Sequence, residues 1–170
     1  MAKVGSQKMS VGILLTIIGG FLDAYTYFAR GGVFANAQTG NIVKLGINLA
    51  QGDFHKVVRF LIPIICFMIG TLITIIMEEP LKKRHLHKRF ILLVELVVYI
   101  FVAFIPNSEI GNIIANSLVS LIMAMQMQAF KSFEGLIYTT TVATGNLRKG
   151  IENMVYGFIQ HDNDKIHSSY

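Results

Sequence analysis

The sequence is poor in cysteine and in charge. Its 170 residues include a single cysteine, Cys66, which lies in an apolar stretch. One cysteine can form neither an internal disulfide framework nor a cysteine-ligated metal site. Only 15% of the residues are charged and 53% are hydrophobic, whereas a soluble domain carries about 25% charge. These scarcities exclude a disulfide scaffold and indicate a membrane protein instead of a soluble domain.

Histidine is also absent from the places where a metal site would need it. The eight methionines are therefore interpreted as adaptable packing residues, because a metal pathway would recruit histidine or cysteine as well. We predict no cofactor and no metal. The five histidines all fall in polar connections or in the tail: His55, His85, His87, His161 and His167.

The long uncharged stretches predict four membrane-spanning helices, at about 11–29, 60–77, 90–105 and 111–130. Pro63 would then lie in the first turn of its span, where proline does little harm. The first span could instead belong to a signal peptide with a cleavage site at residues 35–37, but Asp23 and Arg30 interrupt that pattern. The prediction is one integral membrane domain over 1–170, an all-α polytopic helical bundle.

The net charge of +5 is concentrated beside a hydrophobic segment, which fits membrane orientation better than nucleic-acid binding. We therefore expect the lipid bilayer as partner and no nucleic acid. The basic loop 82–89 is predicted to be cytoplasmic, and the turn at 106–109 to lie on the other side of the inner (plasma) membrane. If Lys3 and Lys8 are also inside, residues 1–82 cross an even number of times. Segment 31–50 should then enter the membrane and return.

Two segments of mixed polarity, 31–50 and 135–159, carry the same tripeptide. Thr39-Gly40-Asn41 recurs as Thr144-Gly145-Asn146 at an offset of 105, which also aligns Asp23 with Gln128. Chance similarity between two apolar segments is the alternative. A duplication predicts repeat 1 at about 9–77, a linking span at 90–105 and a partial repeat 2 at about 111–160. Its closing helix is missing, so the second unit has lost it or the chain is a truncated form of a longer protein.

The most specific stretch is residues 19–46. It carries G-F-x-D-A at 20–24, G-G-x-F at 31–34, and T-G-N at 39–41 leading to L-G at 45–46. In these motifs the chain resembles the YoaK-type family of small multi-spanning bacterial membrane proteins, a domain of unknown function. The resemblance runs over essentially the whole chain and implies a membrane location and a shared fold. It also implies longer relatives with a further C-terminal helix, but no substrate or reaction.

The candidate site residues are polar groups inside apolar segments. A carboxylate within a span is costly unless it faces a partner or water, so Asp23 either serves function or caps or pairs near its helix end. Thr-Gly-Asn suits a helix break or start, either as a packing device or as a solute site built from half-helix ends. The candidates for solute or ion binding are Asp23, Thr39, Gly40, Asn41, Gln128, Thr144, Gly145 and Asn146.

Other polar residues are interpreted as structural. Glu95 lies near the basic loop and could pair with Lys88 or Arg89. Rows spaced by four residues favour close helix packing over pore lining. One row is formed by Gly12, Thr16, Gly20 and Ala24, and the other by Asn112, Asn116, Ser120, Ala124 and Gln128.

Three functions compete. A small permease or channel for a solute or ion would place Asp23, the two Thr-Gly-Asn breaks and Gln128 around a central polar site. A scaffold or sensor that transports nothing would use the same residues for packing only, with or without a homo-oligomer. An intramembrane enzyme needs positioned titratable groups, and only Asp23 and Glu95 lie within spans, so we expect no enzyme.

Overall fold

The computed structural model describes residues 9–81, 86–133, 136–137, 148, 151–152 and 154–156. Within this part of the chain, β1 (Ser132–Phe133) and β2 (Leu136–Ile137) pair as a short antiparallel hairpin. The predicted all-α bundle is confirmed apart from that hairpin. Its helices are α1 (Met9–Ala29), α2 (Gln38–Ala50), α3 (Phe54–Leu81), α4 (Leu86–Phe104) and α5 (Glu109–Ala129).

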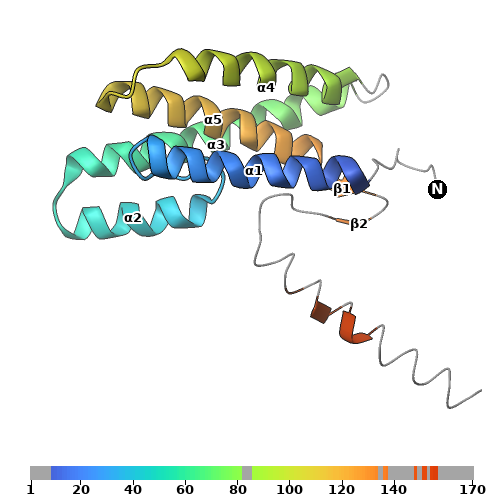
Figure 1. The fold of residues 1–170 in the computed structure, drawn as a ribbon, viewed down its shortest axis with the longest axis horizontal. Helices are drawn as coiled ribbons and strands as arrows, with labels where there is room; N and C mark the ends of the chain where they lie inside the picture. Colours follow the sequence, from blue (N-terminus) through green and yellow to red (C-terminus); the bar gives the residue numbers. More distant parts are fainter. Residues whose placement is uncertain are drawn as a thin grey trace, which may run out of the picture.

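The four long helices run lengthwise through the bundle, and α2 covers only one end of it (Figure 1). α1 and α4 run in one direction, while α3 and α5 run in the other. The start of α1 therefore lies at the same end as the last turn of α3 and the first turn of α4. The loops after α1, α2 and α4 lie at the opposite end. This is the arrangement that an even number of crossings before residue 82 requires.

In the part of the chain that the structure describes, three helices are long and apolar enough to cross a membrane, over Ser10–Ala29, Phe54–Glu78 and Glu109–Ala129. The remaining predicted span, at about 90–105, corresponds to α4. This helix carries Lys88, Arg89 and Glu95 and is not among those three. α3 begins at Phe54, earlier than predicted, so the placement of Pro63 in a first turn is wrong. Asp53 stabilises this earlier start, because its carboxylate accepts a hydrogen bond from the Lys56 amide at 3.2 Å.

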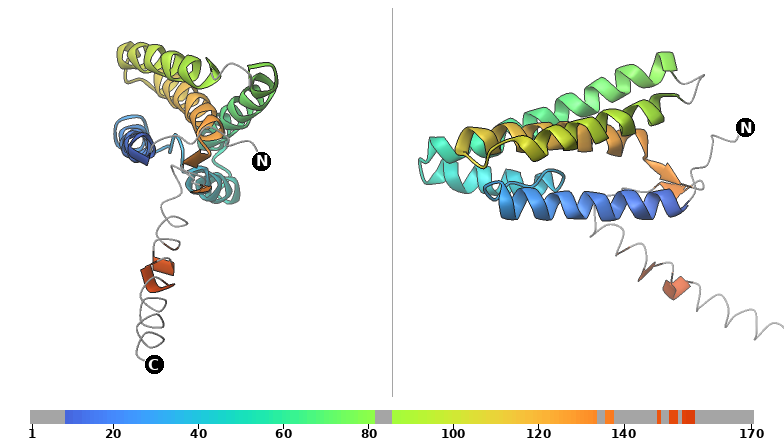
Figure 2. Two further views of the ribbon diagram at one scale, coloured as in Figure 1. Left: turned by 90° about the vertical axis from the view of Figure 1, so that its right-hand side faces the viewer. Right: turned by 45° about the horizontal axis from the view of Figure 1, so that its top comes forward.

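The core is built around α5, which lies in the middle of the other helices when the bundle is seen end-on (Figure 2). Gly70 of α3 makes the closest approach, because a Cβ there would collide with the carbonyl oxygen of Leu121. Ala124 lies beside it, so the prediction of close packing along this row of α5 is confirmed at that position. In the matching row on α1, Gly12 is buried and Thr16 is half-buried, whereas Gly20 and Ala24 are exposed, so close packing was predicted wrongly only for the second half of that row.

The Thr-Gly-Asn motif of the proposed second repeat lies outside the described residues. Thr144, Gly145 and Asn146 all belong to that part. The two-unit organisation and its missing closing helix therefore stay predictions.

Candidate functional site

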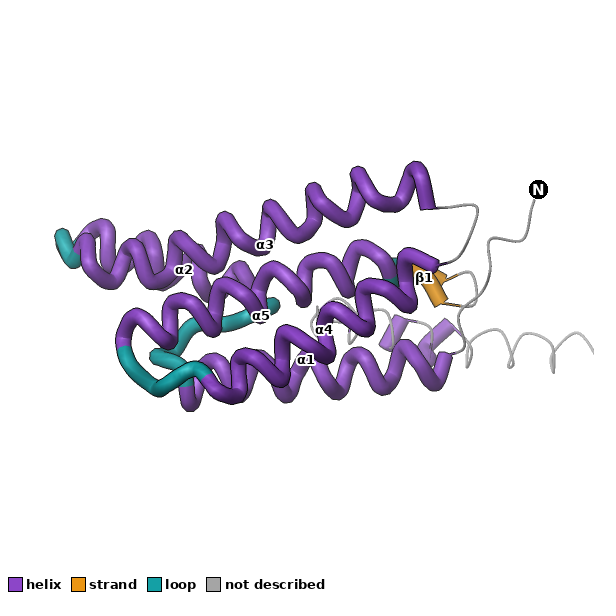
Figure 3. Tube along the Cα trace, turned by 90° about the horizontal axis from the view of Figure 1, so that it is seen from above, coloured by secondary structure: helices purple, strands orange, loops and turns teal. Residues whose placement is uncertain are grey.

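The segment between α1 and α3 enters the bundle and returns to the same end. Gly31 and Gly32 reverse the chain with φ values of 85° and 76°, which side chains other than glycine rarely adopt. The loop then runs back along the bundle, and α2 leads outward again (Figures 1 and 3). α2 has 13 residues, whereas a crossing helix needs about 20. Residues 31–50 therefore form a loop that folds back and a short helix, which agrees with a broken or re-entrant segment and not with a full crossing.

Two polar side chains of α1 hold the tip of this loop. The Asp23 carboxylate accepts hydrogen bonds from the backbone amides of Asn36 at 2.8 Å and Ala37 at 3.4 Å. One turn later, the Thr26 hydroxyl accepts one from the Ala35 amide at 3.1 Å and donates to the Leu22 carbonyl at 2.9 Å. The negative charge of Asp23 also lies just before the first turn of α2, where a helix dipole favours it. Asp23 thus pairs with backbone amides of the loop that leads into α2.

Asn41 joins α2 to the loop through both polar atoms of its side chain. Its amide oxygen accepts a hydrogen bond from the Phe34 amide at 2.9 Å, and its nitrogen donates to the Phe34 carbonyl at 2.7 Å. Thr39 is exposed beside it, and Gly40 leaves room for the Phe34 ring, which would lie 2.7 Å from a Cβ at this position. The tripeptide is therefore a helix start, and its asparagine binds the loop instead of capping α2.

Lys44 occupies a small aromatic cage on the outer side of the loop. Its ammonium group lies 4.0 Å from the centre of the Tyr27 ring and 5.2 Å from that of Phe34. It also donates to the Gly32 carbonyl at 2.7 Å. Hydrogen bonding and cation–π attraction thus hold this charge against the loop.

Arg30 ties the loop to the end of α4. Its guanidinium group donates to the carbonyls of Val102 at 3.1 Å and Ile105 at 2.8 Å, and to the Tyr25 hydroxyl at 2.7 Å. A positive charge at a helix C-terminus complements the partial negative charge of the last carbonyls. Arg30 therefore pairs with α4 and not with Asp23, which corrects one of the roles considered for that aspartate.

The central site expected from the sequence forms only in part. Asp23 and Asn41 hold different residues of the same loop, Asp23 from α1 and Asn41 from α2. Gln128 lies half-buried in the last turn of α5, whereas the Asp23 carboxylate accepts its hydrogen bonds from the loop. Gln128 is therefore not part of this cluster within the described residues.

Three buried side chains of the loop and of α5 keep unpaired polar atoms. Asn116 donates to the Arg30 carbonyl at 2.8 Å, but its amide oxygen has no partner among the described residues. The same holds for the Ser120 hydroxyl and for both side-chain atoms of Asn36. Their exposed fractions are 1%, 0% and 6%. Asn36 is a site residue that the sequence did not single out, because it looks like any other asparagine in a polar loop.

A second polar cluster lies deeper, between α4 and α5. Glu95 is 5% exposed, and one carboxylate oxygen accepts hydrogen bonds from the Tyr99 hydroxyl at 2.7 Å and the Gln126 amide at 3.0 Å. Its other oxygen has no partner among the described residues. The expected pairing of Glu95 with Lys88 or Arg89 is wrong. The spacing of four residues between Glu95 and Tyr99 was the available signal, since it places both on one helix face.

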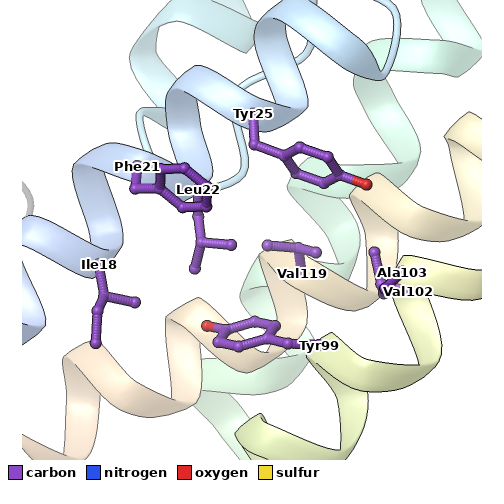
Figure 4. Close-up of a pocket in the computed structure, with 8 residues that line it drawn as sticks. All are labelled: Ile18, Phe21, Leu22, Tyr25, Tyr99, Val102, Ala103 and Val119. Carbon is purple, nitrogen blue, oxygen red and sulfur yellow. The ribbon is translucent and has the colours of Figure 1, made fainter.

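A cavity of about 290 Å³ separates α1 from α4 and α5. Its lining is aliphatic and aromatic, and Tyr99 is shared between the cavity wall and the Glu95 cluster. Figure 4 shows the side chains of the three helices converging on this space. The eight lining residues are Ile18, Phe21, Leu22, Tyr25, Tyr99, Val102, Ala103 and Val119.

The fold and these buried polar clusters define the class as a multi-spanning helical membrane protein. A family model described as "Protein of unknown function (DUF1275)" matches residues 11–169. The chain belongs to this family, in agreement with the YoaK-like resemblance noted in its motifs.

Among curated proteins, the chain is similar to the UPF0700 transmembrane protein YoaK of Bacillus subtilis (strain 168). The two are 29% identical over 150 residues, which cover 83% of this chain and 64% of that relative. The chain thus spans somewhat less than two thirds of the relative it matches. No solved structure matches it.

Proposed function

We propose that this protein is a small permease, which binds a solute or ion inside the helical bundle and moves it across the membrane. The observation that carries the proposal is the group of unpaired polar atoms on Asn36, Asn116 and Ser120. An unpaired buried polar group costs about 1–3 kcal/mol, so water or a polar guest among these atoms would stabilise the site. A half-helix that begins inside the bundle is the setting in which transporters place such guests.

The loop tip lies close to the cavity. Ala35, next to Asn36, packs in one cluster with Leu22, Val102 and Val119, all three of which line the cavity. A guest at the loop tip would therefore have the cavity as its apolar neighbour. This adjacency supports a path through the space between α1, α4 and α5.

A scaffold or sensor is the second candidate. It is favoured by the hydrogen bonds through which Asp23, Thr26 and Asn41 hold the loop. These residues need no solute to explain them. A scaffold leaves the buried polar atoms of Asn36, Asn116 and Ser120 without partners, whereas a polar guest would pair with them. For this reason we favour transport over the scaffold. We propose no enzymatic activity.

Water access at the loop tip tests the permease. Cysteines would replace Asn36 and Ser120 one at a time in a Cys66→Ala background and be treated in membranes with a water-soluble thiol reagent. We expect both to react from at least one side. Ala115→Cys is the matched control, because Ala115 is fully buried on the same stretch of α5 and should stay unreactive. If positions 36 and 120 react no faster than 115, the site is dry and the permease proposal fails.

We also propose that the chain lies in the inner (plasma) membrane with the 82–89 loop in the cytoplasm. The clustering of basic residues in that loop supports this orientation. Cysteines introduced at Arg84 and Asn107 should react with an impermeant reagent from opposite sides of the membrane. Reaction of both from one side would contradict the proposed orientation.

A further inference from the structure

Glu95 is a buried acid with no ion pair among the described residues, and the cations of the surrounding helices have other partners. The ammonium group of Lys88, two turns earlier on α4, lies 5.3 Å from the centre of the Phe130 ring at the end of α5. Lys131 lies 3.5 Å from Glu78 of α3. Arg30, at the end of α1, donates to the last carbonyls of α4. A buried carboxylate without a cationic partner is costly, so Glu95 favours either a proton or a mobile cation.

Tyr99 connects this acid to the cavity. Its hydroxyl group donates to Glu95 at 2.7 Å, and its side chain forms part of the cavity wall. Phe21 and Tyr25 of α1 supply two further aromatic rings on the other side of the same space (Figure 4). Aromatic faces attract cations, and the attraction is stronger where water is excluded.

Two tyrosines line the cavity, and one is hydrogen-bonded to a basic side chain while the other is hydrogen-bonded to an acidic one. Tyr25 accepts a hydrogen bond from Arg30 at 2.7 Å, so that part of the wall is backed by a positive charge. Tyr99 is backed by Glu95. A guest carrying a positive charge would therefore place its head toward Tyr99 and its apolar body against the aliphatic wall. Asp23 does not compete for that head, because its carboxylate accepts the loop amides.

From this juxtaposition we infer that the cavity binds a small lipophilic organic cation, an amine or a quaternary ammonium compound, whose charge is neutralised by Glu95. Binding and protonation of Glu95 exclude each other. When the cation leaves, the carboxylate takes up one proton, and when the cation binds, that proton returns to water. The inference rests on the proposed permease, because it names the solute that the permease would carry.

The test uses the purified full-length chain with benzyltrimethylammonium as the probe and calorimetry as the measurement. Its uncharged isostere, neopentylbenzene, is the matched ligand. We expect the cation to bind at least tenfold more tightly than the isostere at pH 8. Affinity for the cation should fall as the pH is lowered, by up to tenfold per pH unit when one proton replaces one cation.

Three variants assign the effect to residues. Glu95→Gln should weaken cation binding at least tenfold and abolish its pH dependence. Glu78→Gln, an acid outside the cavity, should bind as the original chain does. Phe21 is 68% exposed, so Phe21→Ala should fold normally and weaken the cation a few-fold through the loss of one ring. Circular dichroism confirms folding, and if Glu95→Gln fails to fold, Phe21→Ala and the isostere decide the question.

Equal affinity for the cation and its isostere, or no binding of either, overturns the inference. So does a Glu95→Gln variant that folds and keeps pH-dependent cation binding. Uptake into proteoliposomes separates this result from the permease itself. Cation binding without uptake supports the cation site and refutes transport of the cation. Uptake of another solute without cation binding supports the permease and refutes the cation site.

Discussion

Replacing Asn41 by alanine removes the side chain that joins α2 to the re-entrant loop. The substitution leaves the amide and the carbonyl of Phe34 without their partners at 2.9 and 2.7 Å. Each unpaired buried group costs about 1–3 kcal/mol, so the closed loop should lose at least about 2 kcal/mol. That loss corresponds to ~30-fold more frequent opening of the loop.

Hydrogen–deuterium exchange of the purified protein measures this opening directly. The amides of residues 33–37 should exchange ~30-fold faster in Asn41→Ala, while those in the middle of α5 keep their protection. Asn48→Ala is the matched control. Asn48 is also a buried asparagine of α2, but its side chain donates only to the Lys44 carbonyl within the helix. It should leave exchange in the loop unchanged.

Asn41→Asp sharpens the test, because aspartate can accept from the Phe34 amide but cannot donate to its carbonyl. It should open the loop at least as often as alanine does. Unchanged exchange at 33–37 in both Asn41 variants would refute the role given to this side chain. An equal effect of Asn48→Ala would show that the loop responds to any weakening of α2.

Three further predictions concern the packing and the caps. Gly70→Ala should destabilise the fold strongly in thermal unfolding, because its Cβ would collide with the α5 backbone, whereas Gly46→Ala has open space and should be neutral or stabilising. Thr26→Val keeps the shape of the side chain but leaves a loop amide unpaired, so loop exchange should accelerate as after a loss of about 1–3 kcal/mol. Hydrogen bonds from Lys56 lower the pKa of the exposed Asp53 below its ordinary 3.8. The resulting stabilisation is present above pH 3.8 and is lost as the pH falls through the lowered value, and Asp53→Asn should remove this pH dependence from unfolding curves.

The sequence was informative where a pattern is local. Uncharged stretches located the helices, since about 20 apolar residues are needed to span a bilayer. Mixed polarity and the placement of basic residues together indicated that segment 31–50 turns back. Spacing by four residues correctly marked a packing face on α5 at Ala124.

The partners of polar residues could not be predicted, because they come from segments distant in sequence. Asp23 was recognised as important, but its contact with the amides of residues 36 and 37 depends on how the loop folds back. Glu95 was assigned to nearby basic residues, and it binds Tyr99 and Gln126 instead. Spacing reveals a face of a helix and not what covers it, as the exposed Gly20 shows.

The contact between Asp23 and the loop has a consequence for selectivity. The start of a half-helix is where many transporters hold the negative group of their solute. Here the chain fills that position with a carboxylate of its own, tethered to α1. A dissolved anion would have to displace a group that gives up no translational freedom when it binds. If the chain acts as the proposed permease, this helix start is closed to anions by the protein's own carboxylate, which leaves neutral and positively charged molecules as its guests.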